Sequence, residues 1–260
     1  MLTADFAIHP VPILTDNYVW VLVKNQDAWI IDPGDAEPVA QFCHRHALKP
    51  KAILLTHQHR DHWAGVADLK KTFVLPVYGP NAMPEAVAPL IDVIVIAGDC
   101  IALTGQCWQV VALPGHTAEH IGFYLPGAPG HLLCGDTLFS FGCGRAFYSV
   151  DALFTSVTWI ASLPADTLLY PAHEYTAANW RFAQAVEPTN PDIQSYAARL
   201  NTIGPNNPSV PVSLGDELGR NPFLRCSHSS VQNAAELASG SSFYCDRDVF
   251  SALRAWKNVF

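Results

Sequence analysis

The stretch Thr56-His57-Gln58-His59-Arg60-Asp61-His62 decides the fold and the chemistry that we expect of this chain. It directly follows an apolar run, residues 52–55, which predicts a buried strand. Alternate side chains of an extended segment share a face, so His57 and His59 can bind one metal ion. The turn into a following helix would direct Asp61 and His62 toward a second ion. Such a cluster seldom arises by chance, so we interpret it as metal ligands rather than as core or surface histidines.

Three more candidate ligands each follow an apolar run that predicts a strand. His116 follows residues 108–112, Asp136 follows 131–134 and His173 follows 167–170. Functional loops of α/β folds gather at the carboxyl ends of their strands, so we expect all three near one rim. Each alone is more typical of a turn or a buried polar group. Together with the first motif they indicate a metal site.

Hydrophobic patterning predicts an α/β domain followed by a smaller helical domain. Residues 19–23 and 28–31 predict a hairpin that ends at the turn Asp32-Pro33-Gly34, where Asp32 would stabilise the turn near the site. We expect a helix over 37–46, a second over 61–71 capped by Asp61, and strands at 74–78, 93–96 and 121–125. Helical spacing marks 175–186, 191–203 and 246–256. The predicted domains are 1–174 and 175–260, with a Pro, Gly and Asn-rich connection at 204–222.

Composition excludes several classes of protein. Half of the 260 residues are hydrophobic and 15% are charged, which is typical of a folded globular chain. The formal charge of −8 argues against binding nucleic acid or an anionic membrane, so an anionic ligand needs a local basic cluster. The first ten residues do not resemble a secretory signal, and the apolar stretch 86–98 is too short to span a bilayer. We therefore expect a soluble, cytoplasmic protein that is a monomer.

The cysteine pattern supports the same location. The seven cysteines are odd in number and form no CxxC pair, which predicts reduced thiols in a cytosol rather than a disulfide framework.

The chain resembles the metallo-β-lactamase superfamily, whose mark is HxHxDH followed by a distant His, an Asp and a final His. Within it the sequence resembles the glyoxalase II (hydroxyacylglutathione hydrolase) family over essentially its whole length. The segments that carry this second resemblance are Asp32-Pro33-Gly34, Gly135-Asp136-Thr137-Leu138-Phe139, Gly142-Cys143-Gly144-Arg145, Ala172-His173-Glu174-Tyr175-Thr176, Asn221-Pro222-Phe223-Leu224-Arg225 and the closing pair Arg254 and Lys257.

The resemblance implies a four-layer αββα sandwich for residues 1–174, followed by a helical glutathione-binding domain. It also implies a dinuclear centre with two divalent ions, Zn being favoured over Fe or Mn. One ion would be held by His57, His59 and His116, the other by Asp61, His62 and His173, and Asp136 would bridge them. Asp61 and Asp136 would thereby support catalysis by a metal-bridging hydroxide.

The family pattern further implies that glutathione is contacted by Arg145, Phe147, Tyr175, Arg254 and Lys257. Without the resemblance, Arg254 and Lys257 would be interpreted as a solvated pair at a helix end. The chain departs from the pattern where Gln58 replaces a frequent histidine and Glu119 replaces the usual glycine. Phe147 stands where some relatives have tyrosine, and Tyr148-Ser149 replace the commoner Glu-Gly. These changes concern the contacts to glutathione rather than the metal ligands.

We therefore expect a thioesterase that hydrolyses S-D-lactoylglutathione to glutathione and D-lactate, the second step of methylglyoxal detoxification. Two alternatives remain open at this point: another hydrolase of the superfamily, such as a lactonase, β-lactamase or phosphodiesterase, and a mononuclear-iron persulfide dioxygenase. A non-catalytic glutathione-binding protein is disfavoured by the complete ligand set. No extra basic arm of an RNA-processing member is visible in the sequence.

Overall fold

The computed structural model describes residues 5–204 and 207–260, which form two compact units. The first unit comprises the chain up to Ala112 together with Glu119–Pro126 and Leu132–Gly135. The second comprises Leu113–Ala118, Gly127–His131 and Asp136–Phe260. The domain boundary expected at residue 174 stays a prediction.

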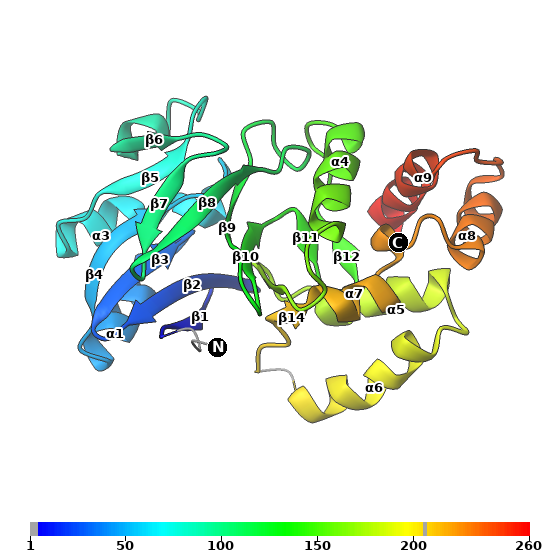
Figure 1. The fold of residues 1–260 in the computed structure, drawn as a ribbon, viewed down its shortest axis with the longest axis horizontal. Coiled ribbons are helices and arrows are strands. Elements are labelled where there is room, and N and C mark those ends of the chain that lie inside the picture. Colours follow the sequence, from blue (N-terminus) through cyan, green and yellow to red (C-terminus); the bar gives the residue numbers. More distant parts are fainter. Residues whose placement is uncertain (1–4, 205–206) are drawn as a thin grey trace. The chain divides into compact units, whose positions relative to one another are not determined.

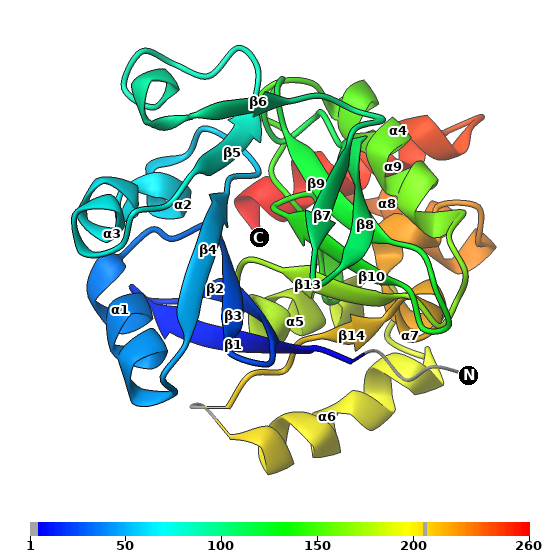
Figure 2. The same cartoon turned by 60° about the vertical axis from the view of Figure 1, so that its left-hand side comes forward.

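The first unit is built on a six-stranded mixed sheet in the order β1-β2-β3-β4-β5-β6 (Figure 1). The three N-terminal strands are antiparallel, and β3 to β6 run parallel. Figure 2 shows α1 and α3 together on one side of this sheet, where they cover a core of aliphatic side chains. The strands are β1 (Ala7–Ile13), β2 (Asn17–Lys24), β3 (Asp27–Ile31), β4 (Lys49–Leu54), β5 (Val77–Pro80) and β6 (Val93–Val95).

The helix expected over residues 61–71 is two helices, α2 (Arg60–Trp63) and α3 (Val66–Thr72). The helix is interrupted at Gly65, because the Gly65 N–H donates to the Pro33 carbonyl at 2.9 Å instead of to a carbonyl of α2. This close approach leaves no room for a Cβ at Gly65, which would lie 2.6 to 2.8 Å from main-chain atoms of the segment 33–36. The predicted Asp61 cap is also wrong: Asp61 lies inside α2, whose N-cap residue is His59 and makes no capping bond through its side chain. In contrast, α1 (Ala36–Arg45) follows the prediction and is capped by the Asp35 side chain.

The first unit also contains strands in the order β10-β9-β8-β7, in which β7, β8 and β9 pair antiparallel. These strands are β7 (Cys100–Leu103), β8 (Gln106–Ala112), β9 (Ile121–Leu125) and β10 (His131–Gly135), and the short 3₁₀ helix η1 (Ala88–Leu90) precedes them. Cys100 and Cys107 are joined by a disulfide, so the expectation of seven reduced thiols is wrong for this pair. The physical reason is the β7–β8 register, which brings their Cα atoms to 5.3 Å, a separation that a disulfide can span.

The second unit is mainly helical. It holds two short strand pairs, β11 (Leu138–Phe139) with β12 (Gly142–Cys143) and β13 (Leu168–Pro171) with β14 (Val212–Ser213). Its helices are α4 (Val150–Ala161), α5 (Thr176–Val186), α6 (Pro191–Ile203), α7 (Leu214–Arg220), the 3₁₀ helix η2 (Pro222–Leu224), α8 (Ser229–Ser239) and α9 (Asp246–Val259). The three predicted C-terminal helices correspond to α5, α6 and α9, whereas α4, α7 and α8 were not predicted.

The seven-residue helix α7 lies inside the stretch that was expected to be an irregular connection. Its Glu217 is fully buried and accepts hydrogen bonds from the main-chain N–H of Phe141 and from the side chains of Ser140 and Asn221. Arg220 completes the set with two bonds to the same carboxylate. These contacts stabilise a helix too short to be recognised from its periodicity.

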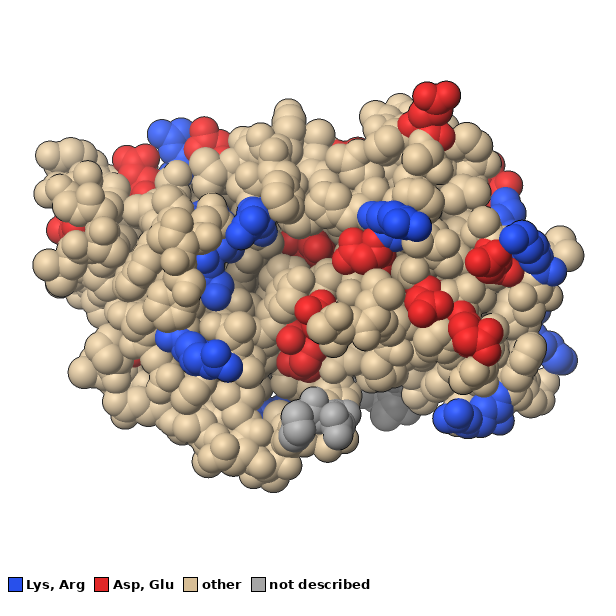
Figure 3. All heavy atoms as spheres, turned by 180° about the vertical axis from the view of Figure 1, so that it is seen from behind, with Lys and Arg blue, Asp and Glu red and all other residues tan. Residues whose placement is uncertain are grey.

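No helix within residues 5–204 and 207–260 combines the length and the apolar character that crossing a bilayer requires. On the face shown in Figure 3, acidic and basic side chains are interspersed rather than gathered into a large patch of one sign.

Candidate functional site

The first group of candidate ligands lies in the first unit, in the loop after β4 and in the short helix α2. The ring nitrogens His57 Nε2 and His59 Nδ1 are 3.1 Å apart. His57 and His62 are buried, and their ring centroids are 4.1 Å apart. The Asp61 carboxylate accepts a 2.8 Å hydrogen bond from Asn17 Nδ2, and its Oδ2 lies 3.6 Å from His62 Nε2. The loop and α2 therefore bring three histidines and one carboxylate close together.

Asp32 orients two of these histidines through a network that is itself buried. Its Oδ2 accepts from the Thr56 hydroxyl at 2.7 Å and lies 3.1 Å from His62 Nδ1, while Oδ1 accepts from Thr56 N–H. Since the Thr56 hydroxyl donates to Asp32, its oxygen accepts from His57 Nδ1 at 3.0 Å. Both imidazoles thus carry their proton on Nδ1 and a lone pair on Nε2, the arrangement of a metal ligand held by an outer partner. The expectation that Asp32 is not itself a ligand stays a prediction.

His120 supports the same loop without being one of the predicted ligands. Its ring stacks on His57 with centroids 4.8 Å apart. Gly135 leaves room for this packing, because a Cβ there would lie 2.7 Å from His120 Nε2 and 2.8 Å from the Thr56 hydroxyl oxygen. His120 therefore packs against a predicted ligand, and its structural role stays a prediction.

The second group of candidate ligands lies in the second unit and is arranged around one carboxylate. His116 Nε2 is 3.3 Å from Asp136 Oδ2, and His173 Nε2 is 3.3 Å from Asp136 Oδ1. Asp136 follows the last residue of β10, and His173 comes two residues after β13 ends. His116 Nδ1 donates to the Arg145 carbonyl at 2.8 Å, so Nε2 carries the lone pair that faces Asp136. Each carboxylate oxygen of Asp136 thus faces a different histidine.

The donor sets fit divalent metal ions. Two nitrogen or oxygen ligands at about 2.0–2.1 Å from one ion lie about 3.3 Å apart when their angle is tetrahedral. The spacings of 3.1 Å between His57 and His59, and of 3.3 Å around Asp136, match this value. Imidazole and carboxylate donors suit Zn, Fe or Mn, and no thiolate belongs to either set. In the first unit, the ligand atoms of Asp32, His57 and His62 also lie within 4.8 Å of one another.

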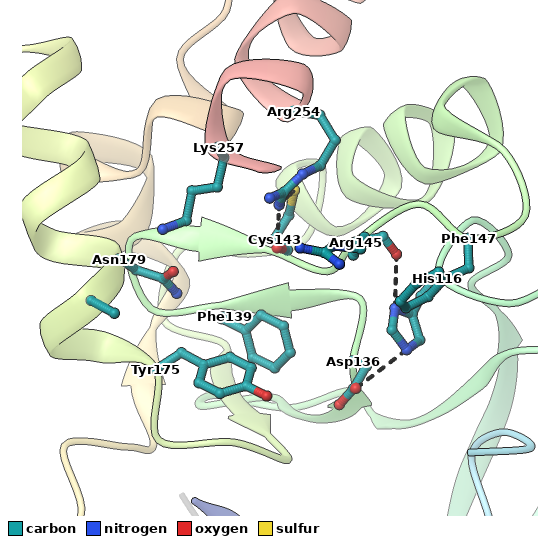
Figure 4. Close-up of a pocket in the computed structure, with 11 residues that line it drawn as sticks. His116, Asp136, Phe139, Cys143, Arg145, Phe147, Tyr175, Asn179, Arg254 and Lys257 are labelled. Atoms are coloured by element: carbon teal, nitrogen blue, oxygen red, sulfur yellow. Dashed lines mark hydrogen bonds and ion pairs between the residues drawn. The ribbon is translucent and has the colours of Figure 1, made fainter. Parts of the chain in front are cut away.

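A cavity of about 420 Å³ in the second unit adjoins His116 and Asp136. Figure 4 shows that its lining includes two arginines, a lysine and three aromatic rings. The residues that line it are His116, Asp136, Phe139, Cys143, Arg145, Phe147, Tyr175, Ala178, Asn179, Arg254 and Lys257. All five residues that were predicted to contact substrate therefore lie around one cavity.

The aromatic rings in this cavity are ordered by mutual packing. Tyr175 stacks on His173 with an interplanar angle of 6° and centroids 4.7 Å apart, and Phe139 packs edge-on against both. Phe147 is 62% exposed and packs edge-on against His116, with the Arg145 guanidinium 5.8 Å from its centroid. All three rings thus contact a predicted metal ligand directly, Tyr175 and Phe139 at His173 and Phe147 at His116.

Two basic residues of α9, Arg254 and Lys257, have different surroundings. Arg254 is buried, and its Nη1 donates to the carbonyls of Cys143 and Gly144 at 2.8 and 3.2 Å. Lys257 Nζ lies 4.9 Å from the ring centroid of Phe182 and 5.9 Å from that of Phe260. Burial, followed by the charge of Arg254, lowers the pKa of Lys257 to about 8. Arg254 thus holds the cavity wall, while Lys257 is a cation whose charge is sensitive to mild alkali.

Cys143 lines the cavity but is not suited to nucleophilic chemistry. Burial raises the pKa of its thiol to about 11, although Arg254 opposes this shift. A thiol that stays protonated near neutral pH is a poor nucleophile and a poor metal ligand.

The sequence did not reveal several residues that organise the site. Thr56, Asn17 and Asn179 were not singled out, because a hydroxyl or amide close to the site only in space leaves no local pattern. The sequence does offer one indication that Thr56 is important, because Thr56 lies between a predicted strand and the first predicted ligand. The remaining partners are known only from the structure.

Two family models match the chain in succession. The model described as Metallo-beta-lactamase superfamily matches residues 14–173, and the model described as Hydroxyacylglutathione hydrolase C-terminus matches residues 174–260. A curated hydroxyacylglutathione hydrolase of Chromohalobacter salexigens is 43% identical over 257 residues, which cover 96% of this chain and 98% of that protein.

Two solved structures are similar to this one. The B3 metallo-β-lactamase BLEG-1 has a TM-score of 0.62 at 25% identity and is matched over 84% of this chain and 99% of its own. TTHA1623 in a di-iron-bound form has a TM-score of 0.55 at 31% identity, over 64% of this chain and 92% of its own. These matches confirm the predicted fold class, a metallo-β-lactamase fold with a helical C-terminal part.

Proposed function

Because this chain belongs to the hydroxyacylglutathione hydrolase family of the metallo-β-lactamase superfamily, we propose that it hydrolyses S-D-lactoylglutathione to glutathione and D-lactate. Its membership of this family makes it an enzyme of the thioester hydrolase class. The proposal concerns the individual substrate, the metal content and the role in methylglyoxal detoxification.

The proposed centre holds two divalent metal ions, with Zn favoured over Fe or Mn. His57, His59 and His116 would hold one ion, Asp61, His62 and His173 the other, and Asp136 both. The support is the orientation of His57, His62 and His116, each with its Nδ1 bonded to an oxygen of its own unit. A similar structure of 31% identity is described as di-iron-bound, which favours two ions over one. When bound, such ions lower the pKa of a water toward neutrality and polarise a carbonyl.

One observation carries the substrate assignment: predicted metal ligands and basic side chains line the same cavity. His116 and Asp136 mark its reacting end, and Arg145 and Lys257 supply positive charge. A glutathione thioester has a carbonyl at its reacting end and a glycine carboxylate on its peptide. The predicted metal ligands match the carbonyl, and the basic side chains match the carboxylate. The cavity thus provides the local basic cluster that a chain of net charge −8 needs to bind an anion.

The chain's own residues bind and orient this substrate. Lys257 would attract the glycine carboxylate, and Arg254 would keep the wall beside it in place through its bonds to two carbonyls. Tyr175, stacked on His173, would contact the peptide, and the exposed Phe147 would cover its apolar part. The leaving group is a thiol of pKa about 8.5, so it departs as a thiolate and requires no general acid from the protein.

The proposal includes a cytoplasmic monomer that binds neither nucleic acid nor membranes. The acidic net charge and the interspersed charges on the visible face support this part of the proposal.

The test is thioester hydrolysis by the purified protein, followed through the loss of ultraviolet absorbance of S-D-lactoylglutathione, with metal content determined on the same sample. We expect turnover with about two ions per chain. Asp136→Asn should lower kcat/KM by about 100-fold or more, because the ions it helps to hold contribute several kcal/mol to catalysis. Asp166→Asn is the matched control, since Asp166 is an exposed carboxylate of the same unit.

Two outcomes would overturn the proposal in different ways. Two bound ions without thioester hydrolysis would indicate another hydrolase of the superfamily. One iron per chain together with oxidation of glutathione persulfide would indicate a dioxygenase.

A further inference from the structure

The Gln58 peptide, between His57 and His59, is held by two side chains from other parts of the first unit. Glu119 Oε1 accepts a 3.0 Å hydrogen bond from the Gln58 N–H. Trp63 Nε1 donates a 2.8 Å hydrogen bond to the Gln58 carbonyl. Gln58 lies in a bend after β4, outside any strand or helix, so its main-chain groups are satisfied by side chains instead of a ladder.

This arrangement bears directly on the two histidines. The spacing of 3.1 Å between His57 Nε2 and His59 Nδ1 depends on the backbone that joins them, which consists of Gln58 alone. A bend held at both its N–H and its carbonyl has fewer accessible conformations, so less conformational entropy is lost when both rings bind one ion.

Residues 119 and 120 contact two adjacent residues of the loop that carries His57 and His59. While Glu119 binds the Gln58 N–H, the next residue, His120, stacks on the His57 ring at 4.8 Å. Glu119 is partly buried and 61 residues away from Gln58 in the sequence, and its carboxylate forms a charge-assisted bond rather than facing only solvent. The unusual acidic residue at this position therefore has a defined contact.

We propose that Glu119, together with Trp63, is a positioning residue for the metal centre and acts on His57 and His59 through the Gln58 peptide. Glu119 does so as a hydrogen-bond acceptor, and its role is to slow the release of the ion that these histidines hold. This inference rests on the proposed ligand role of the two histidines.

The experiment compares Glu119→Ala, Glu119→Gln and Trp63→Phe in the full-length, metal-loaded protein. Glutamine keeps an acceptor oxygen without the charge, and phenylalanine keeps a ring without the indole N–H. The readouts are the rate of metal release to an excess of chelator and the absorption spectrum of the cobalt-substituted protein, which reports ligand geometry. Glu85→Ala is the matched control, because it removes an exposed carboxylate from the same unit. Far-UV circular dichroism verifies that each variant is folded.

We expect Glu119→Ala and Trp63→Phe to release metal about tenfold faster, the lower end of the effect of losing an outer-shell partner. Glu119→Gln should stay within about twofold of the parent, because a neutral acceptor keeps much of the bond. The cobalt spectrum should change in Glu119→Ala and not in Glu85→Ala. Parent-like release and spectrum in Glu119→Ala would overturn the inference. So would equal effects of Ala and Gln, since these would make the charge, rather than the bond, responsible.

A further variant separates this inference from the proposed function. His59→Ala should lower the metal content of the purified protein. If His59→Ala keeps the full parent content, the ligand assignment fails and the inference fails with it. If His59→Ala loses metal while Glu119→Ala behaves as the parent does, only the positioning role is refuted.

Discussion

Lys257 provides a prediction about pH that can be worked out from its surroundings. Its ammonium lies near the rings of Phe182 and Phe260, and burial with the adjacent Arg254 charge lowers its pKa to about 8. The protonated fraction in the free enzyme therefore falls from about nine-tenths at pH 7 to about one-tenth at pH 9. If only the protonated form binds the substrate carboxylate, KM should rise about tenfold over this interval.

The sign of this effect follows from which form binds. A lowered pKa means that the charged lysine is lost at a lower pH than usual, so binding weakens as pH rises through 8. In the complex, the bound carboxylate favours the charged lysine and raises its pKa again, so kcat should change much less than KM. The assay is steady-state hydrolysis of the glutathione thioester at a series of pH values and constant ionic strength.

The informative control is Lys257→Arg, because arginine stays charged over this range. Its KM should lose most of the rise with pH, while any titration of the substrate's own amine affects the parent and the variant alike. A neutral Lys257→Gln variant should show a raised KM at every pH. A flat KM in the parent, or an equal rise in Lys257→Arg, would refute the argument.

Four further predictions concern the metal centre, packing and redox state. Asp32→Asn weakens the partner of His62 and should lower metal affinity about 10- to 100-fold in a chelator competition assay; unchanged affinity would contradict its orienting role. Gly65→Ala forces a Cβ against main-chain atoms and should lower the free energy of unfolding by about 1–3 kcal/mol in urea. Glu217→Ala leaves Arg220 buried without its carboxylate and should cost about 3–5 kcal/mol by the same measurement; a loss near zero would refute the network. Unfolded, unreduced protein should titrate five thiols, since the β7–β8 pair is a disulfide; seven would show that pair to be reduced.

Secondary structure was predictable where one face of an element is repeatedly apolar. The run 19–23 lies within β2, in which all but the last two residues are buried, and the helical spacing of 191–203 matches α6. The prediction failed where long-range contacts decide. The helix expected over 61–71 is interrupted where the Gly65 N–H donates to the Pro33 carbonyl, and α7 depends on the buried Glu217. Such contacts leave no periodic signal in the sequence.

The metal-ligand hypothesis could be formed from the sequence because its signals are local. The spacing of His57, His59 and Asp61 sets which side chains share a face, and a position just after a strand sets the edge at which His116 and His173 emerge. The family resemblance added the five predicted substrate contacts, and all of them line one cavity of the second unit. Side-chain chemistry and short-range geometry were sufficient for these inferences.

The tertiary structure alone decided the protonation and environment of these groups. The Nδ1 protons of His57 and His62 depend on a network around Asp32, the low pKa of Lys257 depends on its burial and on the Arg254 charge, and the Gln58 peptide is held by Glu119. A hydrogen bond requires atoms within a few ångströms, and partners such as Asp32 and His62, 30 positions apart, or Gln58 and Glu119, 61 positions apart, meet only after folding. The sequence thus determined which groups are available for chemistry, and the folded chain determined how each of them is held.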